Sequence, residues 1–505
     1  MILRRIDSLL NRITMYRLVL YYLIVLIGAG VLFSILHLLS YDPLGLVFTT
    51  LFLIAACYAT NKLFAWAFHL TPNVESVYIT ALIFALIITP PTTMDDFWFV
   101  IWMGVLAMAS KYVIAFRRKH IFNPVAFGAL IVAVALNQTA SWWVGSAPML
   151  PLVVIGGLLI VRKLRRFDLV FSFFAGTLVT LLIFSSHQNI TSVLHNDVLY
   201  SPLFFFAFVI LTEPLTTPPT RRLRIIYGLL VGVLFTPEFH VGAFFLTPEL
   251  AIVIGNVFSW LVSPKTRLIL TLRDKLQLSP DTWEFSFTPG QKFAFAPGQY
   301  MEWTLGHPYT DSRGNRRYFT LASAPTEPII RLGVKFYDKP SSFKRALLKL
   351  DDTRPIVAAQ IAGDFTLPGD PHLPVVLIAG GIGITPYRSM LKYLLDTQQT
   401  RPITVLYTNK TPADILYRDV LDAAQRELGV RVIYTLTDSA SAPPDWGGEV
   451  GRIDQAMIER EIPDYPVATY YLCGSLSLVD GMKALLHQIG IPSSRIKTDY
   501  FSGLA

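Results

Sequence analysis

Long apolar stretches fill the first half of the chain, whereas the second half alternates between short apolar runs and polar residues. A helix needs about 20 predominantly apolar residues to cross a bilayer. Ten stretches meet or approach that length: 17–39, 44–60, 75–90, 97–116, 122–137, 144–161, 168–186, 200–213, 225–236 and 241–262. The pattern therefore predicts a polytopic α-helical membrane domain of about ten helices over residues 1–264.

Charges between these stretches indicate an orientation. Lys and Arg gather at the N-terminus, around Lys62, and in 117–120, 162–166, 220–224 and 264–267. The intervening connections, 40–43, 92–96, 137–143, 185–197 and 236–240, contain no Lys or Arg. Because positively charged loops remain in the cytoplasm, we expect a multi-pass protein of the inner (plasma) membrane with its N-terminus and second half cytoplasmic. The first apolar run is too long for a cleavable signal peptide.

Proline and polar residues interrupt the membrane half in three segments. These are FNPVAFG (122–128), EPLTTPPT (213–220) and LTPEL (246–250), of which we place the last inside the final span. Broken segments at membrane depth line cavities or binding sites, although the prolines could simply kink helices. Intramembrane acids are functional candidates, so Glu249 and Glu213 are of interest. An ion pair with Arg221 or Arg222 explains Glu213 equally well.

Composition separates the two halves further. Apolar residues make up 53% of the 505 residues and charged residues 15%, and the mean hydropathy is +0.48. Residues 1–264 contain 16 Lys/Arg and 10 Asp/Glu, against 27 and 25 in the remainder. The net charge of +8 therefore lies mainly in the membrane half and does not indicate nucleic-acid binding. Two isolated cysteines, and histidines confined to span ends and loops, lead us to expect no metal site or paired haems.

The second half contains two kinds of strand pattern. Short β-type runs, bounded by turn residues, occupy 267–278, 282–289, 299–306, 318–323 and 329–337. They predict an antiparallel β-barrel over residues 265–368. Apolar strands at 374–381, 402–408, 430–438 and 468–475 then alternate with helical stretches. This alternation predicts an α/β parallel-sheet nucleotide-binding domain over residues 369–505.

A glycine-rich turn, GGIGITP (380–386), follows the first of these apolar strands and precedes a helix. Glycines at such a place let the backbone approach a pyrophosphate, and the helix N-terminus favours negative charge. The turn ends in Thr-Pro and departs from the G-x-G-x-x-G fingerprint. Its candidate contacts to a dinucleotide are Gly380, Gly381, Gly383, Thr385 and Pro386.

Residues 75–260 resemble the NqrB/RnfD family, the flavin-carrying membrane subunits of the sodium-pumping NADH:quinone reductase and the Rnf complex. The matching strings are ITALIFALIITPPT (79–92), KHIFNPVAFG (119–128) and TEPLTTPPTRRLRIIYGLLVGVL (212–234). The resemblance implies a membrane flavin and electron transfer across the bilayer. The family's S-G-A-T attachment string does not occur, so we expect non-covalent FMN or riboflavin. Asn123, Thr216 and Thr217 are its candidate contacts, and sodium pumping is not implied for one chain.

The second half resembles the ferredoxin–NADP reductase superfamily over nearly its whole length. The motifs occur in order: FAPGQY (295–300), RYFTLAS (317–323), KPSSFKRAL (339–347), GDFTLP (363–368), GGIGITP, YLCGS (471–475) and TDYFSG (498–503). The resemblance implies FAD and NAD(P)H as cofactors. Arg317 would pair with the flavin pyrophosphate, Phe319 lie against the isoalloxazine and Thr320 contact its N5 edge. Ser342 would bind phosphate, although Lys339 stands where the motif has glycine.

The same resemblance assigns roles near the nicotinamide. Cys473 and Gly474 would adjoin its C4 atom, and Asp499 and Phe501 correspond to the family's C-terminal acidic and aromatic residues. A buried structural cysteine remains the alternative for Cys473. Asp438 suits a free ribose 2′-hydroxyl and favours NADH, whereas Lys410 could still reach the phosphate of NADPH.

Together the two halves predict an NAD(P)H-dependent flavin oxidoreductase. Electrons would pass from NAD(P)H to FAD, then to a membrane flavin, and then to a quinone, flavin or other acceptor. Two alternatives stay open: a membrane-anchored ferredoxin or flavodoxin reductase, and a flavin or ion transporter coupled to a reductase module. The sequence leaves the oligomeric state and the final acceptor undetermined.

Overall fold

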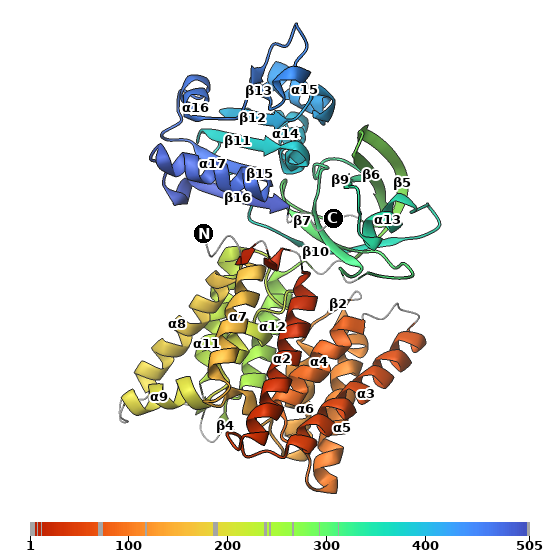
Figure 1. Cartoon of the computed structure of the whole chain (residues 1–505), viewed down its shortest axis with the longest axis vertical. Coiled ribbons are helices and arrows are strands. Elements are labelled where there is room, and N and C mark those ends of the chain that lie inside the picture. Colours follow the sequence, from red (N-terminus) through yellow and green to blue (C-terminus); the bar gives the residue numbers. More distant parts are fainter. Residues whose placement is uncertain are drawn as a thin grey trace. The chain divides into compact units, whose positions relative to one another are not determined.

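A computed structural model describes residues 6–7, 9–11, 13–68, 74–116, 119–184, 190–236, 240–241, 244–264, 267–291, 293–311 and 313–501. The chain divides into two compact units, Met1–Thr266 and Arg267–Ala505 (Figure 1). Each is described by itself below.

The first unit is helical. Its helices are α2 (Met15–Ile35), α3 (Pro43–Ala67), α4 (Val74–Ile87), α5 (Met94–Val113), α6 (Pro124–Leu136), α7 (Leu150–Leu164), α8 (Phe167–Phe184), α9 (Ile190–Tyr200), α10 (Leu203–Phe205), α11 (Arg221–Phe235) and α12 (Pro248–Val262). In the described part, α2, α3, α5 and α8 are long and apolar enough to cross a membrane. A fifth candidate is the pair Thr191–Tyr200 and Leu203–Ile210, bent by 62°. The remaining predicted spans are shorter helices or irregular segments, so the number ten stays a prediction.

Helix boundaries differ from the predicted spans where capping residues and apolar spacing decide them. Pro248 opens α12 and the Thr247 side chain accepts the Leu250 N–H at 3.3 Å, so LTPEL begins the last helix and does not lie inside it. Lys62 lies within α3, not in a loop, because apolar residues continue to Ala67. Helix α9 occupies part of the predicted loop 185–197, where apolar residues recur at helical spacing.

Helices α8 and α11 approach each other closely because glycines line their contact. A Cβ atom at Gly228 would lie 2.6 Å from the Leu169 carbonyl oxygen, and one at Gly232 would lie 2.3 Å from that of Phe173. A Cβ atom at Gly176 would likewise meet the Leu229 carbonyl oxygen at 2.7 Å. Gly228 and Gly232 form the small-xxx-small spacing that lets helix backbones touch in apolar surroundings.

The second unit begins with a six-stranded antiparallel sheet of half-barrel form. Its strands are β5 (Leu268–Ser279), β6 (Thr282–Pro289), β7 (Tyr300–Thr304), β8 (Arg316–Thr320), β9 (Ile330–Lys335) and β10 (Ile356–Ala362), in the order β8-β7-β10-β5-β6-β9. Just after β8, the Ala322 N–H donates to the Arg331 carbonyl of β9 at 3.0 Å, which draws the two edges together. Phe287, Trp303 and Phe343, the last from α13 (Ser342–Leu348), pack in the interior.

A parallel sheet follows, in the order β14-β13-β12-β11-β15-β16 (Figure 1). Its strands are β11 (Val375–Gly380), β12 (Ile403–Asn409), β13 (Arg431–Leu436), β14 (Glu449–Val450), β15 (Thr469–Ser475) and β16 (Ile496–Phe501). Alternate strand residues pack onto α14 (Thr385–Asp396) and α15 (Arg418–Leu428) on one face, and onto α16 (Gln455–Glu461) and α17 (Leu476–Gln488) on the other. Strand order reverses between β11 and β15, and open α/β sheets bind ligands at the carboxyl ends of such strands.

Candidate functional site

The glycine-rich turn and the Cys473–Gly474 segment meet where the strand order reverses. A Cβ atom at Gly383 would lie 2.3 Å from the Cys473 carbonyl oxygen, so only glycine permits this approach. Gly381 has a φ of +53° and open space where a Cβ atom would point. The predicted residues from the two distant motifs are therefore brought together, with room on the outer side of the turn.

Helix α14 starts directly at this turn. Thr385 opens the helix and its hydroxyl donates to the Ile382 carbonyl at 3.1 Å. Pro386, which has no N–H, is tolerated in the first turn because those amides have no partner within the helix. The N-terminal end of α14 therefore carries partial positive charge directly after the glycine-rich turn.

Two buried tyrosines that were not predicted from the sequence fix the turn and the start of α14 through hydrogen bonds of their hydroxyls. The Tyr407 hydroxyl donates to the Gly381 carbonyl at 3.0 Å and accepts the Leu416 N–H at 3.2 Å. The Tyr387 hydroxyl donates to the Tyr471 carbonyl at 2.7 Å and thereby ties α14 to β15. Only tertiary contacts reveal these roles.

Polar side chains at the end of β12 also fit a ligand. Thr408 and Asn409 are more than nine-tenths buried. Among the residues that the structure describes, the Thr408 hydroxyl has no hydrogen-bond partner, whereas the Asn409 side chain interacts with the Tyr407 hydroxyl. Buried polar groups are costly when unpaired. Together with the open glycine turn, they make this sheet edge suitable for a nucleotide.

Asp438 and Lys410, the two residues that bear on NADH or NADPH choice, are neighbours. The Asp438 N–H donates to the Lys410 carbonyl at 3.3 Å. The Asp438 side chain accepts the Ala440 N–H at 3.2 Å, which orients the carboxylate at the end of the segment after β13. Lys410 is exposed and Asp438 is half-buried, so neither side chain is closed off from solvent.

Cys473 and Asp499 are register partners on the neighbouring strands β15 and β16. The Cys473 side chain is fully buried. Burial, followed by the Asp499 carboxylate, raises the pKa of the Cys473 thiol well above its usual value, so the thiol stays uncharged at neutral pH. Phe501 ends β16, but its side chain lies outside the part of the chain that the structure describes.

Residues predicted to face the flavin surround Phe343. The Arg317 guanidinium carbon lies 5.3 Å from the centre of the Phe343 ring, and the Phe319 ring lies 6.0 Å from it. Alternation along β8 places Arg317 and Phe319 on one face and the buried Thr320 on the other. Arg317 is itself buried and donates to the Arg313 carbonyl at 2.6 Å.

Ser342, the predicted phosphate contact, is engaged by two residues, Asp311 and His307. Its N–H donates to the Asp311 carboxylate at 2.8 Å, and its hydroxyl lies 2.9 Å from His307 Nε2 and accepts the Asp311 N–H. Burial raises the pKa of Asp311, but hydrogen bonds from Ser342 and Arg313 outweigh it and lower that pKa to about 2. An ionised carboxylate thus lies where the motif places a phosphate.

Positive charge collects beside these residues. Burial, and then the nearby charges of Arg317 and Arg313, lower the pKa of Lys344 to about 8. The Lys344 ammonium donates to the Lys335 carbonyl at 2.7 Å. The Asp311 carboxylate pairs with Arg313 at 2.8 Å, which leaves Arg317 and Lys344 as the cations whose repulsion a pyrophosphate would offset. Of these two, only Arg317 was predicted from the sequence.

In the first unit, a half-buried carboxylate joins two of the candidate membrane-flavin contacts. Glu213 accepts the Asn123 side-chain amide at 2.8 Å and the Thr216 hydroxyl at 3.2 Å. The network continues through Asn256, whose Oδ1 accepts the Asn123 N–H at 2.7 Å and whose Nδ2 donates to the Tyr227 hydroxyl at 3.1 Å. We call these five residues the Glu213 network.

Two further predicted residues in this unit have separate partners. The Thr217 hydroxyl donates to the Pro214 carbonyl at 3.3 Å. Glu249 lies in the first turn of α12, where its carboxylate accepts the Trp142 indole N–H at 2.7 Å and both side chains are buried. The structure therefore places a buried carboxylate in this unit, apart from the half-buried Glu213 and its network.

Comparison with known proteins matches one segment in each half of the chain. Residues 143–268 match the sequence model of the NQR2, RnfD, RnfE family. Residues 377–484 match that of the oxidoreductase NAD-binding domain. The chain joins an NQR2, RnfD, RnfE family domain to an oxidoreductase NAD-binding domain. The predicted resemblance is thereby confirmed, and the NAD-binding domain supports the predicted enzyme class.

Relatives of known name match the second half. The reductase component of propane 2-monooxygenase from Mycolicibacterium smegmatis is 33% identical over 254 residues, 48% of this chain and 66% of that protein. The flavohemoprotein of Bacillus thuringiensis subsp. konkukian is 30% identical over 231 residues, 43% and 55% respectively. The chain thus spans between about half and two thirds of these relatives. The crystal structure of Amycolatopsis cytochrome P450 reductase GcoB has a TM-score of 0.41 at 22% identity, covering 47% of this chain and 71% of that one.

The candidate residues fall partly inside and partly outside the two ranges that the family models match. The NAD-binding domain contains the glycine-rich turn, Asp438 and Cys473, while Asp499 follows it. The NQR2, RnfD, RnfE family domain contains Glu213 and most of its network, and Asn123 lies before the matched range.

Proposed function

We propose that the protein is a membrane flavoprotein that takes a hydride from cytoplasmic NAD(P)H onto FAD and passes electrons into or across the membrane. The route would run through a non-covalent membrane flavin to a quinone or an outer-face acceptor. The observation that carries the proposal is that one chain joins an oxidoreductase NAD-binding domain to an NQR2, RnfD, RnfE family domain. The family model and the four long apolar helices support a membrane location.

We infer that residues 369–505 bind the nicotinamide nucleotide. The first turn of α14 and the open side of Gly381 would hold the pyrophosphate, with Tyr407 keeping the turn in shape. Cys473 would present an uncharged thiol to the nicotinamide. Asp438 would favour NADH, because a carboxylate accepts a hydrogen bond from a ribose hydroxyl and repels a phosphate.

Residues 265–368 would bind FAD. Arg317 and Lys344 would bind its pyrophosphate, and Phe319 would pack against its ring system, while Arg313 stays paired with Asp311. When bound, FAD supplies the conversion of a two-electron donor into single-electron steps. The protein's own contribution is to neutralise the phosphates, exclude water and hold the nucleotide in reach.

Residues 1–264 would form the membrane part, with the positively charged connections in the cytoplasm. The Glu213 network supplies polar groups from α6, α11, α12 and the turn before α11 for a membrane flavin. The half-buried Glu213 and the buried Glu249 also favour a second candidate, an ion or flavin transporter coupled to the reductase. The small number of long apolar helices favours a third, a membrane-anchored ferredoxin or flavodoxin reductase.

Flavin analysis tests the proposal. The full chain is purified in mild detergent, and its flavins are extracted with acid, identified and counted. We expect FAD together with FMN or riboflavin, about two flavins per chain, and NADH-driven reduction of an acceptor enclosed on the far side of liposomes. One FAD alone would refute the membrane flavin and leave the anchored reductase or the transporter.

A further inference from the structure

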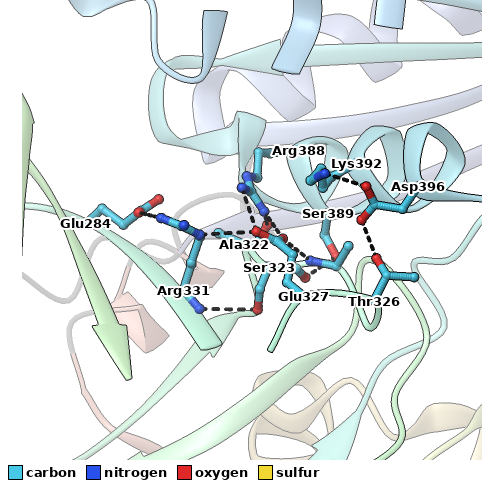
Figure 2. Close-up of polar contacts among 11 residues, drawn as sticks. Glu284, Ala322, Ser323, Thr326, Glu327, Arg331, Arg388, Ser389, Lys392 and Asp396 are labelled. Atoms are coloured by element: carbon cyan, nitrogen blue, oxygen red, sulfur yellow. Dashed lines mark hydrogen bonds and ion pairs between the residues drawn. The ribbon is translucent and has the colours of Figure 1, made fainter. Parts of the chain in front are cut away.

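Helix α14 contacts the antiparallel sheet through two side chains that follow its first turn. The Arg388 guanidinium donates to the Ala322 carbonyl at 3.1 Å, and the Ser389 hydroxyl donates to the Ser323 carbonyl at 2.6 Å (Figure 2). Both accepting groups are backbone carbonyls in the segment that leaves β8. The helix that starts at the nucleotide turn is therefore fastened directly to the end of the strand predicted to face the flavin.

A buried carboxylate completes this fastening. Glu327 lies between Arg388 and Arg331 in Figure 2. Its Oε1 accepts Arg388 Nη2 at 3.0 Å and Arg331 Nε at 3.2 Å, and its Oε2 accepts Arg388 Nη1 and the Ala324 N–H. The Glu327 and Arg388 side chains are only 9% and 7% exposed. We call Glu327, Arg388 and Ser389 the α14 clamp.

The energetics of such a pair indicate a geometric role. Burial raises the pKa of Glu327, but Arg388 and Arg331 outweigh it and hold that pKa below its usual value. Replacing a buried ion pair by apolar residues is often neutral for stability, whereas removing one partner leaves a costly buried charge. An intact pair therefore contributes less to net stability than to a defined arrangement of the groups around it.

The clamp connects the two places where hydride transfer would be aligned. Arg388 lies three residues after Thr385, which opens α14 at the nucleotide turn, and Ala322 lies two residues after Thr320. Reacting atoms need to be about 3–3.5 Å apart, and a misplacement of about 1 Å can cost about 100-fold in rate. Small shifts of α14 against the segment 321–323 would change that distance directly.

We propose that Arg388, held by Glu327 and assisted by Ser389, is a positioning residue that sets the nicotinamide against the flavin for hydride transfer. This inference rests on the proposed reductase function. The reaction breaks the C4–H bond of NAD(P)H and moves a hydride, with both electrons, to FAD, leaving NAD(P)⁺. The clamp takes no part in the bond changes and acts only through the placement of the two binding segments.

The test uses the full-length protein in detergent, loaded with FAD, and anaerobic stopped-flow reduction by NADH. In R388M and E327Q the limiting rate of flavin reduction should fall about 10- to 100-fold, while FAD content and the Kd for NADH stay within about twofold. The limiting rate should fall less in R388K, because lysine keeps the positive charge although it cannot make the bidentate contact with Glu327. The matched control is T326A, which removes another bond between the same segments, from Thr326 to Asp396 at 2.5 Å, at the exposed end of α14. The limiting rate of flavin reduction in T326A should stay within about twofold of the wild-type rate.

Two readouts do not depend on activity. The long-wavelength charge-transfer absorbance of the reduced protein with NAD⁺ should weaken in R388M and E327Q but not in T326A. In FAD-free protein, R388M should speed amide exchange at residues 321–325 and in the first turns of α14. Unchanged rates and absorbance in both clamp variants, or a fall in rate that only follows lost FAD, would overturn the inference. If the wild-type flavin is not reduced by NADH or NADPH, the proposed function fails, and amide exchange still tests the clamp.

Discussion

Lys344 should make flavin binding depend on pH. Its ammonium is buried, and its pKa of about 8 reflects first that burial and then the charges of Arg317 and Arg313. A bound pyrophosphate would offset the repulsion among these cations and return the pKa towards the ~10.4 of a free lysine. FAD binding should therefore take up a proton above pH 8.

The size of the effect follows from these values. With a pKa of about 8, roughly nine-tenths of Lys344 is charged at pH 7 and roughly one-tenth at pH 9. The Kd for FAD should therefore rise about 10-fold between pH 7 and pH 9. At still higher pH the loss of binding free energy should approach a limit of about 3 kcal/mol. The folding stability of the FAD-free protein should change with pH in the opposite direction to FAD affinity: it should increase. The unfolded chain holds this proton more tightly, so Lys344 makes stability rise with pH between about 8 and 10.4.

The assay is titration of FAD-depleted full-length protein, followed by flavin fluorescence from pH 7 to pH 9. Calorimetry at pH 9 in two buffers of different ionisation enthalpy measures the proton uptake. K344M should give a Kd that varies little with pH. K339M removes an exposed lysine from the segment just before α13, the helix that carries Lys344, and should keep the wild-type slope. A wild-type Kd that is constant across this range, or an equal slope in K344M, would refute the reasoning.

Three further predictions concern other parts of the chain. G383A places a Cβ atom 2.3 Å from the Cys473 carbonyl oxygen, so we expect the KM for NADH in ferricyanide reduction to rise at least ~10-fold with FAD content unchanged; an unaltered KM would contradict the turn geometry. G232A places a Cβ atom 2.3 Å from the Phe173 carbonyl oxygen and should destabilise the helical unit by ~1–3 kcal/mol. The Tm in detergent should fall, while ferricyanide reduction is retained. D438S should narrow the preference for NADH by ~10-fold in kcat/KM through better use of NADPH; an unchanged ratio would remove Asp438 from cofactor choice.

The strands were predictable where their apolar pattern is strong. The runs at 282–289 and 374–381 coincide closely with β6 and β11, because turn residues bound them on both sides. Strand β10 was missed because alanines and Gln360 dilute its alternation. Strand β16 was expected only as a functional segment, since polar residues interrupt its pattern at the sheet edge.

Some residues of the candidate site could likewise be predicted from the sequence, and others could not. The glycine-rich turn and Cys473 could be selected from sequence because each lies directly after an apolar strand, and parallel pairing then brings them together. Tyr407, Arg388 and Glu327 could not, because their roles come from contacts with residues distant in sequence. Proline positions misled the prediction in the helical unit, where Pro248 opens a helix instead of breaking one.

The α14 clamp bears on how such reductases could exchange parts during evolution. Two of its bonds end on the carbonyls of Ala322 and Ser323, which every amino acid provides. Only the Glu327–Arg388 pair requires particular side chains on both sides. A recombined protein would therefore need to inherit few matched residues across this junction, and chimeras that keep that one pair are the natural starting point for grafting a new nucleotide specificity onto this flavin sheet.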